Sequence, residues 1–415
     1  MARKMKDSGI EWIGEIPEGW EVVPVKRLCT MQAGKNLTSE QIAPEGAYPV
    51  YGGNGIRGFF SDYNCDGQFL TVGRQGALCG NVHKINGKVW ATEHAVITAP
   101  SSYAILDFLY YLLIGMDLNQ YVSSTAAQPG LAVGTLLNLK TCYPCSTLEQ
   151  TQISNYLNAK CSEIDVMLSK TRSSIEEYKK LKQAVITQAV TKGVHGEREM
   201  KDSGVDYIGQ IPAKWVLGKL RNVGDTQNGI SKSSEFFGKG FPFVSYSDVY
   251  KNYSLPFAVS GLVESTPEEQ ERYSVKKGDI FFTRTSETIE EVGFSCVCEK
   301  DIPNATFAGF LIRVRPFSDK LYTPYAKYHF RSSHLRFYLV KEMNLVTRAS
   351  LGQSLLKSMP VLLPPLEEQK EIADYLDAKC AEIDGLIAKK EQLVKELESY
   401  KKSLIYEVVT GKWEV

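Results

Sequence analysis

Two long stretches of the chain repeat apolar side chains at the spacing of one helix face. Counted in heptads from Ile383, the apolar positions of residues 368–410 are Ile383, Leu386, Leu393, Leu397, Tyr400 and Leu404, with Lys390 as the break. Residues 149–191 carry Ile164, Met167, Tyr178, Leu181 and Val185, and Leu168, Ile175, Ile387 and Val394 widen the two stripes. These stripes predict two helices that each bury one face. At ~1.5 Å per residue, each would be a rod of roughly 60 Å.

The two stretches are copies of each other. Residues 156–165 and 375–384 agree at eight of ten positions, at an offset of 219 residues. A second repeat opens each half of the chain, since residues 5–20 match residues 200–215 at ten of sixteen positions. The sequence therefore predicts a tandem duplication. We expect the two helices to pair antiparallel about a pseudo-twofold axis, although each helix could instead pack on its own neighbouring body.

The material between the repeats predicts two globular bodies, residues 21–147 and 216–363. Both alternate short β-type runs with glycine turns, and helical character is expected at residues 102–119 and 324–341. The fold class is therefore mixed α/β. The remaining segments are a lead at residues 1–20, a central helix at 148–194, a second lead at 195–215 and a C-terminal helix at 364–415.

Composition and charge narrow the class of protein. The chain has a formal net charge of zero, with 23% charged and 43% hydrophobic residues, which is typical of a globular protein. No stretch has the pattern of a signal peptide or a membrane span, so we expect a cytoplasmic protein without a membrane partner. Nine scattered cysteines favour reduced thiols. Cys142 and Cys145 form one C-x-x-C without a second knuckle, so no metal site is predicted.

Charge is distributed unevenly along the chain. Residues 302–363 contain nine Lys or Arg and two acidic residues. We expect the basic, aromatic-rich segment 313–348 to contact nucleic-acid phosphates. The alternative for its individual residues is the solvated face of an amphipathic helix.

Motifs for catalysis are missing from the sequence. It contains no triphosphate-binding loop, no nucleophile elbow and no H-E-x-x-H zinc motif. Residues 53–58 read G-N-G-I-R-G and match the letters of a dinucleotide-binding loop, but no helical pattern follows them. No catalytic centre is predicted.

Polar loops at strand ends are the candidate binding residues. The candidates are Tyr51, Asn54, Arg57, Arg74 and Gln75 in the first body, and Ser245, Tyr246, Ser247, Arg284, Thr285, Ser286 and Arg348 in the second. Arginine can bridge two acceptors of guanine, asparagine or glutamine can bridge adenine, and glycine lets a loop enter a groove. Each loop could also be an ordinary turn. Two different readers on a rigid spacer would suit a split, asymmetric DNA site.

The repeated segments resemble a known protein family. Pro364 and Pro365 precede L-E-E-Q-K-E-I-A-D-Y-L-D-A-K, the second helix ends in V-T-G-K, and both leads read K-D-S-G-[IV]-[ED]-[WY]-I-G-[EQ]-I-P. Together these segments resemble the DNA specificity subunit of type I restriction-modification systems. The segments G-N-G-I-R-G, G-R-Q-G-A and F-F-T-R-T-S-E-T also resemble its target-recognition domains. The first helix departs from the pattern, because Pro144-Cys145-Ser146-Thr147 replaces the Pro-Pro lead.

The resemblance implies a non-catalytic subunit. Two target-recognition domains would each read one half of a bipartite site, and a long antiparallel coiled coil would hold them apart. The helix positions expected to pack and to dock partners are Tyr156, Leu157, Ile164, Tyr375, Leu376 and Ile383. The implied partners are double-stranded DNA, two methyltransferase subunits and a motor-nuclease subunit. S-adenosylmethionine, ATP and Mg²⁺ would belong to those partner subunits, and this chain would hold no cofactor.

Two other classes of function stay open from the residues alone. A coiled-coil scaffold whose bodies bind proteins would have no salt-dependent affinity for DNA. A self-contained endonuclease or methyltransferase is disfavoured by the missing motifs.

Overall fold

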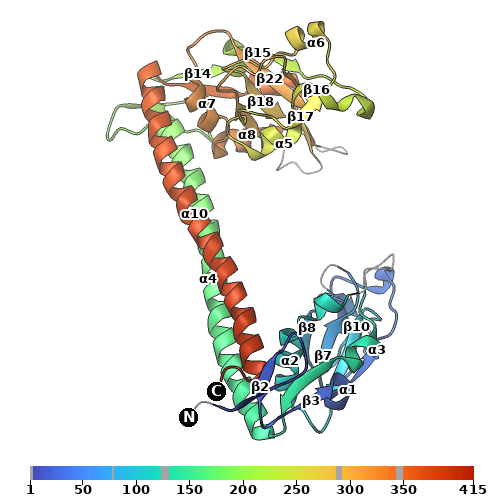
Figure 1. Ribbon diagram of the computed structural model, residues 1–415. Helices are drawn as coiled ribbons and strands as arrows, with labels where there is room; N and C mark the ends of the chain where they lie inside the picture. The colour runs from blue at the N-terminus through green and yellow to red at the C-terminus, as the bar shows by residue number, and fades with distance from the viewer. Residues whose placement is uncertain (1–2, 77–78, 123–129, 287–291, 343–348) are drawn as a thin grey trace. The chain divides into compact units, whose positions relative to one another are not determined.

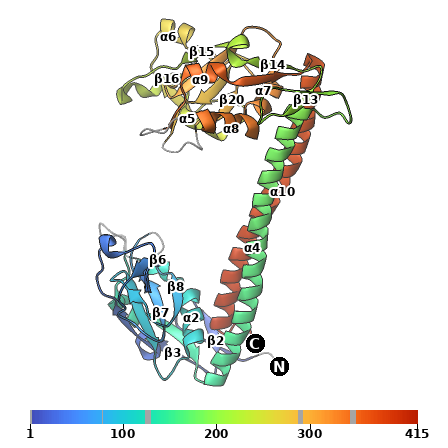
Figure 2. The same cartoon turned by 180° about the vertical axis from the view of Figure 1, so that it is seen from behind.

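The computed structural model describes residues 3–76, 79–122, 130–286, 292–342 and 349–415. The chain divides into two compact units (Figures 1 and 2). Unit 1 comprises residues 1–173 and 391–415, and unit 2 comprises residues 174–390. Two long helices, α4 (Thr147–Lys192) and α10 (Leu366–Val409), contribute residues to both units. The two predicted long helices are thus confirmed.

Unit 1 is built on two small sheets. The larger sheet is antiparallel, in the order β4 (Cys29–Ala33), β10 (Ala95–Pro100), β7 (Gln68–Gly73) and β8 (Val82–Asn86). The smaller sheet has the order β6 (Gly55–Phe60), β5 (Tyr48–Gly52) and β9 (Trp90–Ala91), and β5 runs parallel to β9. The apolar run of β7 places it at the centre of the unit, where Leu70 and Val72 are fully buried.

The lead and the end of the first body close unit 1. The lead forms the hairpin β1 (Met5–Asp7) with β2 (Glu15–Pro17), and β3 (Trp20–Pro24) pairs with β11 (Lys140–Pro144). Three helices, α1 (Val25–Leu28), α2 (Leu106–Gly115) and α3 (Val133–Asn138), flank the sheets. The core joins side chains of α2 to Leu157 and Ile164 of α4 and to Ile405 and Val409 of α10.

Unit 2 repeats this plan strand by strand. Its larger sheet has the order β15 (Gly224–Asn228), β22 (Leu311–Pro316), β18 (Ile280–Thr283) and β20 (Ser295–Val297). Its smaller sheet has the order β17 (Gly261–Val263), β16 (Phe237–Val244) and β21 (Thr306–Phe307), with β16 parallel to β21. The pairs β12 (Met200–Asp202) with β13 (Gln210–Pro212) and β14 (Val216–Lys219) with β24 (Pro360–Leu363) repeat the lead and closing strands, and β19 (Thr285–Ser286) pairs with β23 (Ala349–Ser350).

The helices of unit 2 differ in one respect from the sequence prediction. They are α5 (Tyr246–Lys251), α6 (Pro267–Arg272), α7 (Thr323–His329), α8 (Ser333–Glu342) and α9 (Gln353–Ser358). The prediction of a single helix at residues 324–341 is therefore wrong, because this segment forms two helices, α7 and α8. The Ser332 hydroxyl donates to the carbonyl oxygen of His329 at 2.5 Å, which satisfies an acceptor at the end of α7.

The long helices pair antiparallel, and the repeat explains their matching contacts. In unit 1, Lys401 of α10 pairs with Asp165 of α4, with 2.6 Å between Nζ and Oδ1. In unit 2, Lys182 of α4 pairs with Asp384 of α10, also at 2.6 Å. The two ion pairs are equivalent, because Asp165 and Lys182 lie 219 residues before Asp384 and Lys401. The predicted pairing and the tandem duplication are both confirmed.

The heptad spacing predicted for these helices holds only in part: Ile164, Ile383 and Leu404 are buried, but other predicted positions are not. The buried stripe of α4 is Ile153, Ile164, Ile175 and Ile186, which recur every eleven residues. In α10 the equivalent positions are Ile372, Ile383, Val394 and Ile405, of which Val394 is partly buried. The predicted heptad positions Met167, Leu181, Leu393 and Tyr400 are exposed. In a helix with 3.6 residues per turn, a heptad repeat drifts around the axis by ~20° every seven residues, whereas an eleven-residue repeat drifts by a similar angle only every eleven residues and in the opposite sense.

Candidate nucleic-acid interface

The loop after β7 in unit 1 holds two of the predicted reading residues, Arg74 and Gln75. The Arg74 N–H donates to the carbonyl oxygen of His94 at 2.9 Å, and the Arg74 carbonyl oxygen accepts from the Leu131 N–H at 2.9 Å. The backbone of Arg74 is therefore held from both sides. Its guanidinium has no hydrogen bond or ion pair among the residues that the structure describes.

Arg284 occupies the same place in unit 2. It follows β18, the equivalent of β7, and its N–H donates to the carbonyl oxygen of Phe310 at 2.8 Å. Its carbonyl oxygen accepts from the Leu351 N–H at 2.7 Å. Arg74 and Arg284 thus make the same two backbone bonds after equivalent strands of the two larger sheets. Within the described chain the Arg284 guanidinium also has no bonded partner.

A second pair of segments is equivalent by the register of the smaller sheets. In unit 1 the Thr92 N–H donates to the carbonyl oxygen of Tyr51 at 2.9 Å. In unit 2 the Ala308 N–H donates to the carbonyl oxygen of Val244 at 3.0 Å. Because Tyr51 corresponds to Val244, residues 52–54 correspond to residues 245–247. The structure therefore brings the predicted segments of each body to matching strand ends.

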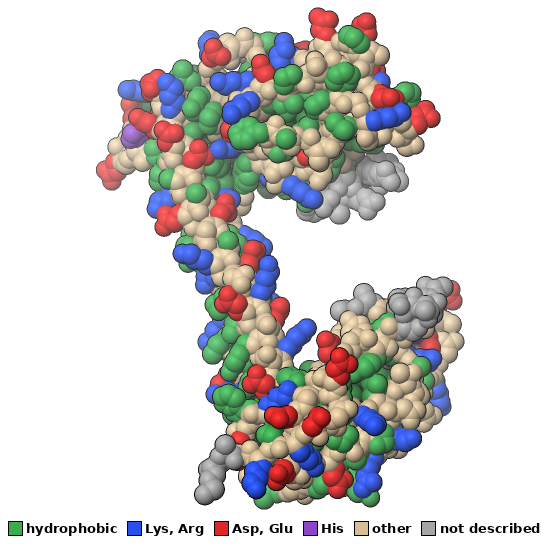
Figure 3. Space-filling model, in the orientation of Figure 1, with side chains coloured by type: hydrophobic (Ala, Val, Ile, Leu, Met, Phe, Trp, Pro, Cys, Tyr) green, Lys and Arg blue, Asp and Glu red, His purple; other side chains and the backbone are tan. Residues whose placement is uncertain are grey.

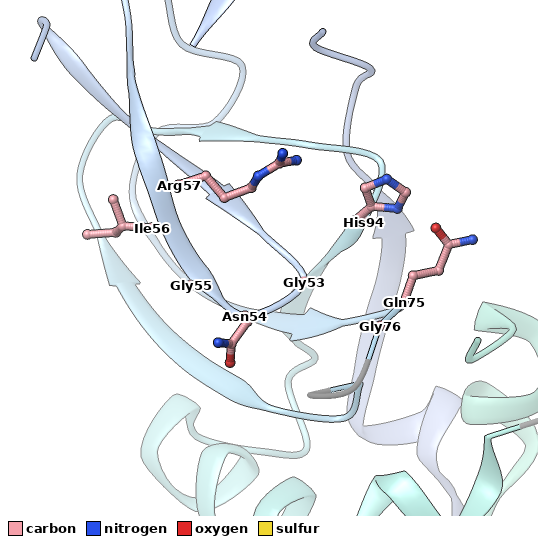
Figure 4. A pocket seen from close by; sticks show the side chains of 8 residues that line it. All are labelled: Gly53, Asn54, Gly55, Ile56, Arg57, Gln75, Gly76 and His94. Carbon is pink, nitrogen blue, oxygen red and sulfur yellow. The ribbon is translucent and has the colours of Figure 1, made fainter. Parts of the chain in front are cut away.

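In unit 1 these segments line a cavity of about 590 Å³. Its lining comprises Gly53, Asn54, Gly55, Ile56, Arg57, Gln75, Gly76 and His94 (Figure 4). Arg57, Gln75 and His94 converge in this view, whereas the side chain of Ile56 points away from them. Glycine is needed at position 53, because a Cβ there would lie 2.8 Å from the Gln75 carbonyl oxygen. The cavity thus presents amide, guanidinium and imidazole groups to a ligand.

Some of the polar side chains around this cavity already have hydrogen-bond or ion-pair partners, and others have none among the described residues. Asn54 accepts a hydrogen bond from Asn81 at 2.7 Å, and the Nε2 atom of His94 lies 3.0 Å from the Glu93 carboxylate. The exposed Arg57 has no bonded partner in the described ranges. His83 lies behind the β5–β6 turn, and burial lowers its pKa, so its ring is neutral at pH 7. Cationic and neutral donors are therefore both present.

In unit 2 the corresponding segment is the start of a helix, which corrects the loop expected at residues 245–248. Ser245 caps α5, since its hydroxyl accepts from the Asp248 N–H and Asp248 bonds back to the Ser245 N–H at 2.8 Å. Tyr246 stacks on Tyr250, with ring centroids 6.0 Å apart. Ser247 is exposed. A capping serine followed by tyrosine replaces the glycine turn of unit 1.

The remaining predicted DNA contacts are only partly described. Thr285 and Ser286 form β19 and pair with residues 349–350. The side chain of Ser286 and the whole of Arg348 lie outside the described residues.

The prediction that segment 313–348 contacts phosphates is wrong for four of its cations, which are bonded within unit 2. Arg313 is only 7% exposed and donates to Ser274 at 2.7 Å, and Arg315 pairs with Asp279 at 2.7 Å. Lys327 pairs with Asp377 at 2.6 Å. Arg331 donates to the carbonyl oxygens of Ser295, Val249, Tyr250 and Asn252. These cations hold unit 2 together, so the basic excess of the segment is mostly internal.

The predicted helix residues fall into two classes. Leu157, Ile164, Leu376 and Ile383 lie in the cores of their units. Tyr156 is half-buried and Tyr375 is 40% exposed on α10, so Tyr375 is not a core residue. Their predicted role in docking partners stays a prediction.

Sequence reasoning missed one contact that occurs in both units. In unit 1, Trp20 Nε1 donates to Glu149 at 3.0 Å, and Arg3 bonds the same carboxylate and lies 5.6 Å above the Trp20 ring. Unit 2 repeats this arrangement. Trp215 Nε1 donates to Glu368 at 2.9 Å, and Arg198 bonds the same carboxylate and lies 5.4 Å above the Trp215 ring. We call each trio a lead clamp, because it ties a lead to the first turn of a long helix. The signal was present, since all three residue types recur at the two repeat offsets.

Charges of both signs are intermixed over the face drawn in Figure 3. Within the described ranges, no three His, Cys, Asp or Glu side chains are arranged to hold a metal ion. In the same part of the chain, no helix has the length and apolar character needed to cross a membrane.

Comparison with known proteins identifies the family of this architecture. The model of the type I restriction modification DNA specificity domain matches residues 17–177 and residues 212–396, which together exceed half of the chain. The chain belongs to the type I restriction-modification DNA specificity family. It contains two specificity domains, and each match includes one of the two strand-end sites described above. Proteins of this family recognise DNA sequence and are generally non-catalytic, so the scaffold function without DNA specificity is not favoured.

Individual specificity subunits support this assignment. The chain is 44% identical over 121 residues to the type I restriction enzyme EcoprrI specificity subunit of Escherichia coli, covering 28% of this chain and 30% of that protein. It is 25% identical over 421 residues to the MjaVIII specificity subunit of Methanocaldococcus jannaschii, and the match covers 96% of this chain and 94% of that protein. A solved structure from work on assembly and conformational transition of the type I R-M system has a TM-score of 0.71 at 17% identity, covering 96% of this chain and 99% of that one. This last likeness concerns the fold alone.

Proposed function

We propose that this specificity subunit reads a bipartite, asymmetric DNA site, with one half-site for each specificity domain. The observation that carries the proposal is the matched position of Arg74 and Arg284, each held by the same two backbone bonds at the same strand end. Both guanidinium groups have no bonded partner among the described residues, so they are available to the two acceptors of guanine. The residues that surround them differ between the units.

This difference in surroundings supports an asymmetric site. The cavity next to the Arg74 loop is lined by glycine, asparagine, arginine, glutamine and histidine and by Ile56, whose side chain points away from the polar groups. Serine, tyrosine and phenylalanine take the matching positions beside Arg284. Because hydrogen-bonding and apolar side chains select different base edges, the two half-sites should differ in sequence.

The catalytic work is assigned to other subunits. Two methyltransferase subunits would bind S-adenosylmethionine and methylate adenine, and a motor-nuclease subunit would use ATP and Mg²⁺. The paired helices α4 and α10 and the two leads are the proposed docking surfaces for these partners. They recur in both halves, so they offer two equivalent sites to two copies of one partner.

Sequencing of methylated adenine in host DNA tests this function. Deletion of the chain should remove one bipartite methylation motif, and restoring the chain should restore that motif. An unchanged pattern of methylation would contradict the proposal. Loss of a continuous, palindromic motif would contradict the asymmetric reading.

A further inference from the structure

The turn before β10 and the turn before β22 place one side chain beside each candidate arginine. In unit 1 the Ala95 N–H donates to Thr92 at 2.9 Å and closes a turn whose third residue is His94. In unit 2 the Leu311 N–H donates to Ala308 at 2.9 Å, and the third residue is Phe310. The carbonyl oxygens of His94 and Phe310 accept the N–H groups of Arg74 and Arg284. His94 and Phe310 therefore occupy one structural position with different chemistry.

Phe310 is an exposed apolar side chain on a turn whose backbone is fixed by hydrogen bonds. Its side chain is 64% exposed and stacks on no aromatic ring among the described residues. The turn itself is tightly packed, because a Cβ on Gly309 would lie 2.4 Å from Ser231 Oγ. The Gly309 N–H also donates to Ile230 at 2.8 Å. The backbone thus presents the ring to solvent in a fixed place.

We propose that Phe310 is a specificity-determining residue that contacts the 5-methyl group of a thymine. The inference rests on the proposed function, and it places this thymine next to the base that Arg284 contacts. In the major groove the methyl group is the feature that distinguishes thymine, and apolar side chains such as phenylalanine contact it. His94 holds the equivalent place in unit 1 and offers hydrogen bonds or stacking there. The two half-sites are therefore read by different chemistry at matching positions.

Removal of the methyl group from DNA tests this contact without any change to the protein. Each thymine of the recognised site is replaced singly by deoxyuridine, and binding of the assembled methyltransferase complex is measured. One replacement should weaken binding about fourfold, the contribution of one buried methyl group. Replacement at the other positions should leave affinity unchanged wherever the methyl group is not contacted.

Two variants connect that position to Phe310. Phe310→Ala should bind the thymine-containing site about fourfold less tightly than the unchanged protein and should not respond to deoxyuridine at the sensitive position. Phe310→Leu should keep most of the response, because it retains an apolar contact. Phe257→Ala is the matched control, since Phe257 is 74% exposed in the same unit but lies against Lys300, beyond the opposite end of β18. It should behave like the unchanged protein.

Three results would overturn the role of Phe310 while leaving the proposed function intact. The first is a specific complex that tolerates deoxyuridine at every thymine, and the second is a recognised site without thymine. The third is a Phe310→Ala variant that loses equal affinity for unrelated DNA, which would indicate a wedge between bases. A complex that does not distinguish any site from unrelated DNA would instead contradict the proposed function itself.

Discussion

The lead clamp of unit 2 provides a sharp test of how the leads are held. Glu368 lies in the first turn of α10, its side chain is 13% exposed, and it accepts from Trp215 and from Arg198. In Glu368→Gln the amide oxygen can still accept one hydrogen bond, but the negative charge is lost. Hydrogen bonds to charged groups contribute roughly 1.5–3 kcal/mol and neutral ones roughly 0.5–1.5 kcal/mol. We therefore expect the lead to be destabilised by about 1–2 kcal/mol.

A neighbouring residue gives the matched control. Glu367 lies in the same helical turn, but its side chain is 79% exposed, and its one ion-pair partner among the described residues is Lys370, three residues away. Glu367→Gln removes the same charge from the same helix end, so the interaction with the helix dipole cancels in the comparison. An exposed pair of this kind contributes about 0.5 kcal/mol or less. The difference between the two variants then isolates the clamp.

Amide hydrogen exchange measures the expected effect directly. Glu368→Gln should accelerate exchange in residues 200–215 by roughly 5- to 30-fold, which corresponds to about 1–2 kcal/mol. Exchange in residues 5–20 should not change, because that lead is tied to Glu149. Glu149→Gln should give the reverse pattern. Equal acceleration by Glu367→Gln, or acceleration of both leads by one substitution, would refute the clamp.

Two further predictions concern acid stability and base recognition. Burial lowers the pKa of His334 to about 4 and holds that of the fully buried His329 well below its usual value, so both are neutral when folded. Unit 2 should therefore be fully stable above pH 6.5 and lose stability as the pH falls towards 4, with about 2 kcal/mol lost at pH 5 through His334 alone. The free energy of unfolding in urea, measured above pH 6.5 and at pH 5, checks this loss. A His334→Leu variant that keeps the same pH dependence would contradict it. Arg74→Ala and Arg284→Ala should each relax one half-site at a cost of ~1–3 kcal/mol in binding of the cognate DNA. Binding selection from randomised DNA measures this, and equal losses on unrelated sequences would make both arginines phosphate contacts.

The parts of the fold that were predictable are those that the repeats carry. Residues 156–165 and 375–384 are nearly identical, so the two helices, their antiparallel pairing and the duplicated leads could be predicted from the sequence. The spacing of the helix contacts was misjudged, although the signal was present in Ile153, Ile164, Ile175 and Ile186. The eleven-residue spacing was missed because heptads were assumed.

The equivalence of the two bodies was beyond sequence reasoning at the level of individual residues. Arg74 and Arg284 were selected as members of polar loops, but their shared position depends on hydrogen bonds to His94 and Phe310 and to Leu131 and Leu351. These bonds join segments up to 67 residues apart that share little sequence between the units. Pairings over such separations are not encoded in local patterns.

The basic segment 313–348 shows a second limit of prediction from sequence. Arg331 appears in the sequence as one of several cations, yet it donates to carbonyl oxygens of residues 249–252, about eighty positions earlier in the chain. Whether an arginine is free or already bonded depends on which carbonyl oxygens the fold brings to it. Charge counts alone therefore could not separate Arg313 and Arg331 from Arg284.

Exchange of one specificity domain tests whether each domain reads its own half-site. Residues 21–147 are replaced by the corresponding domain of another member of the family, and methylated adenine is mapped in cells that contain the partner subunits. Independent reading by each domain predicts that one half-site changes while the other half-site and the gap between them stay the same. A change in both half-sites, or a change in the gap, would contradict the account.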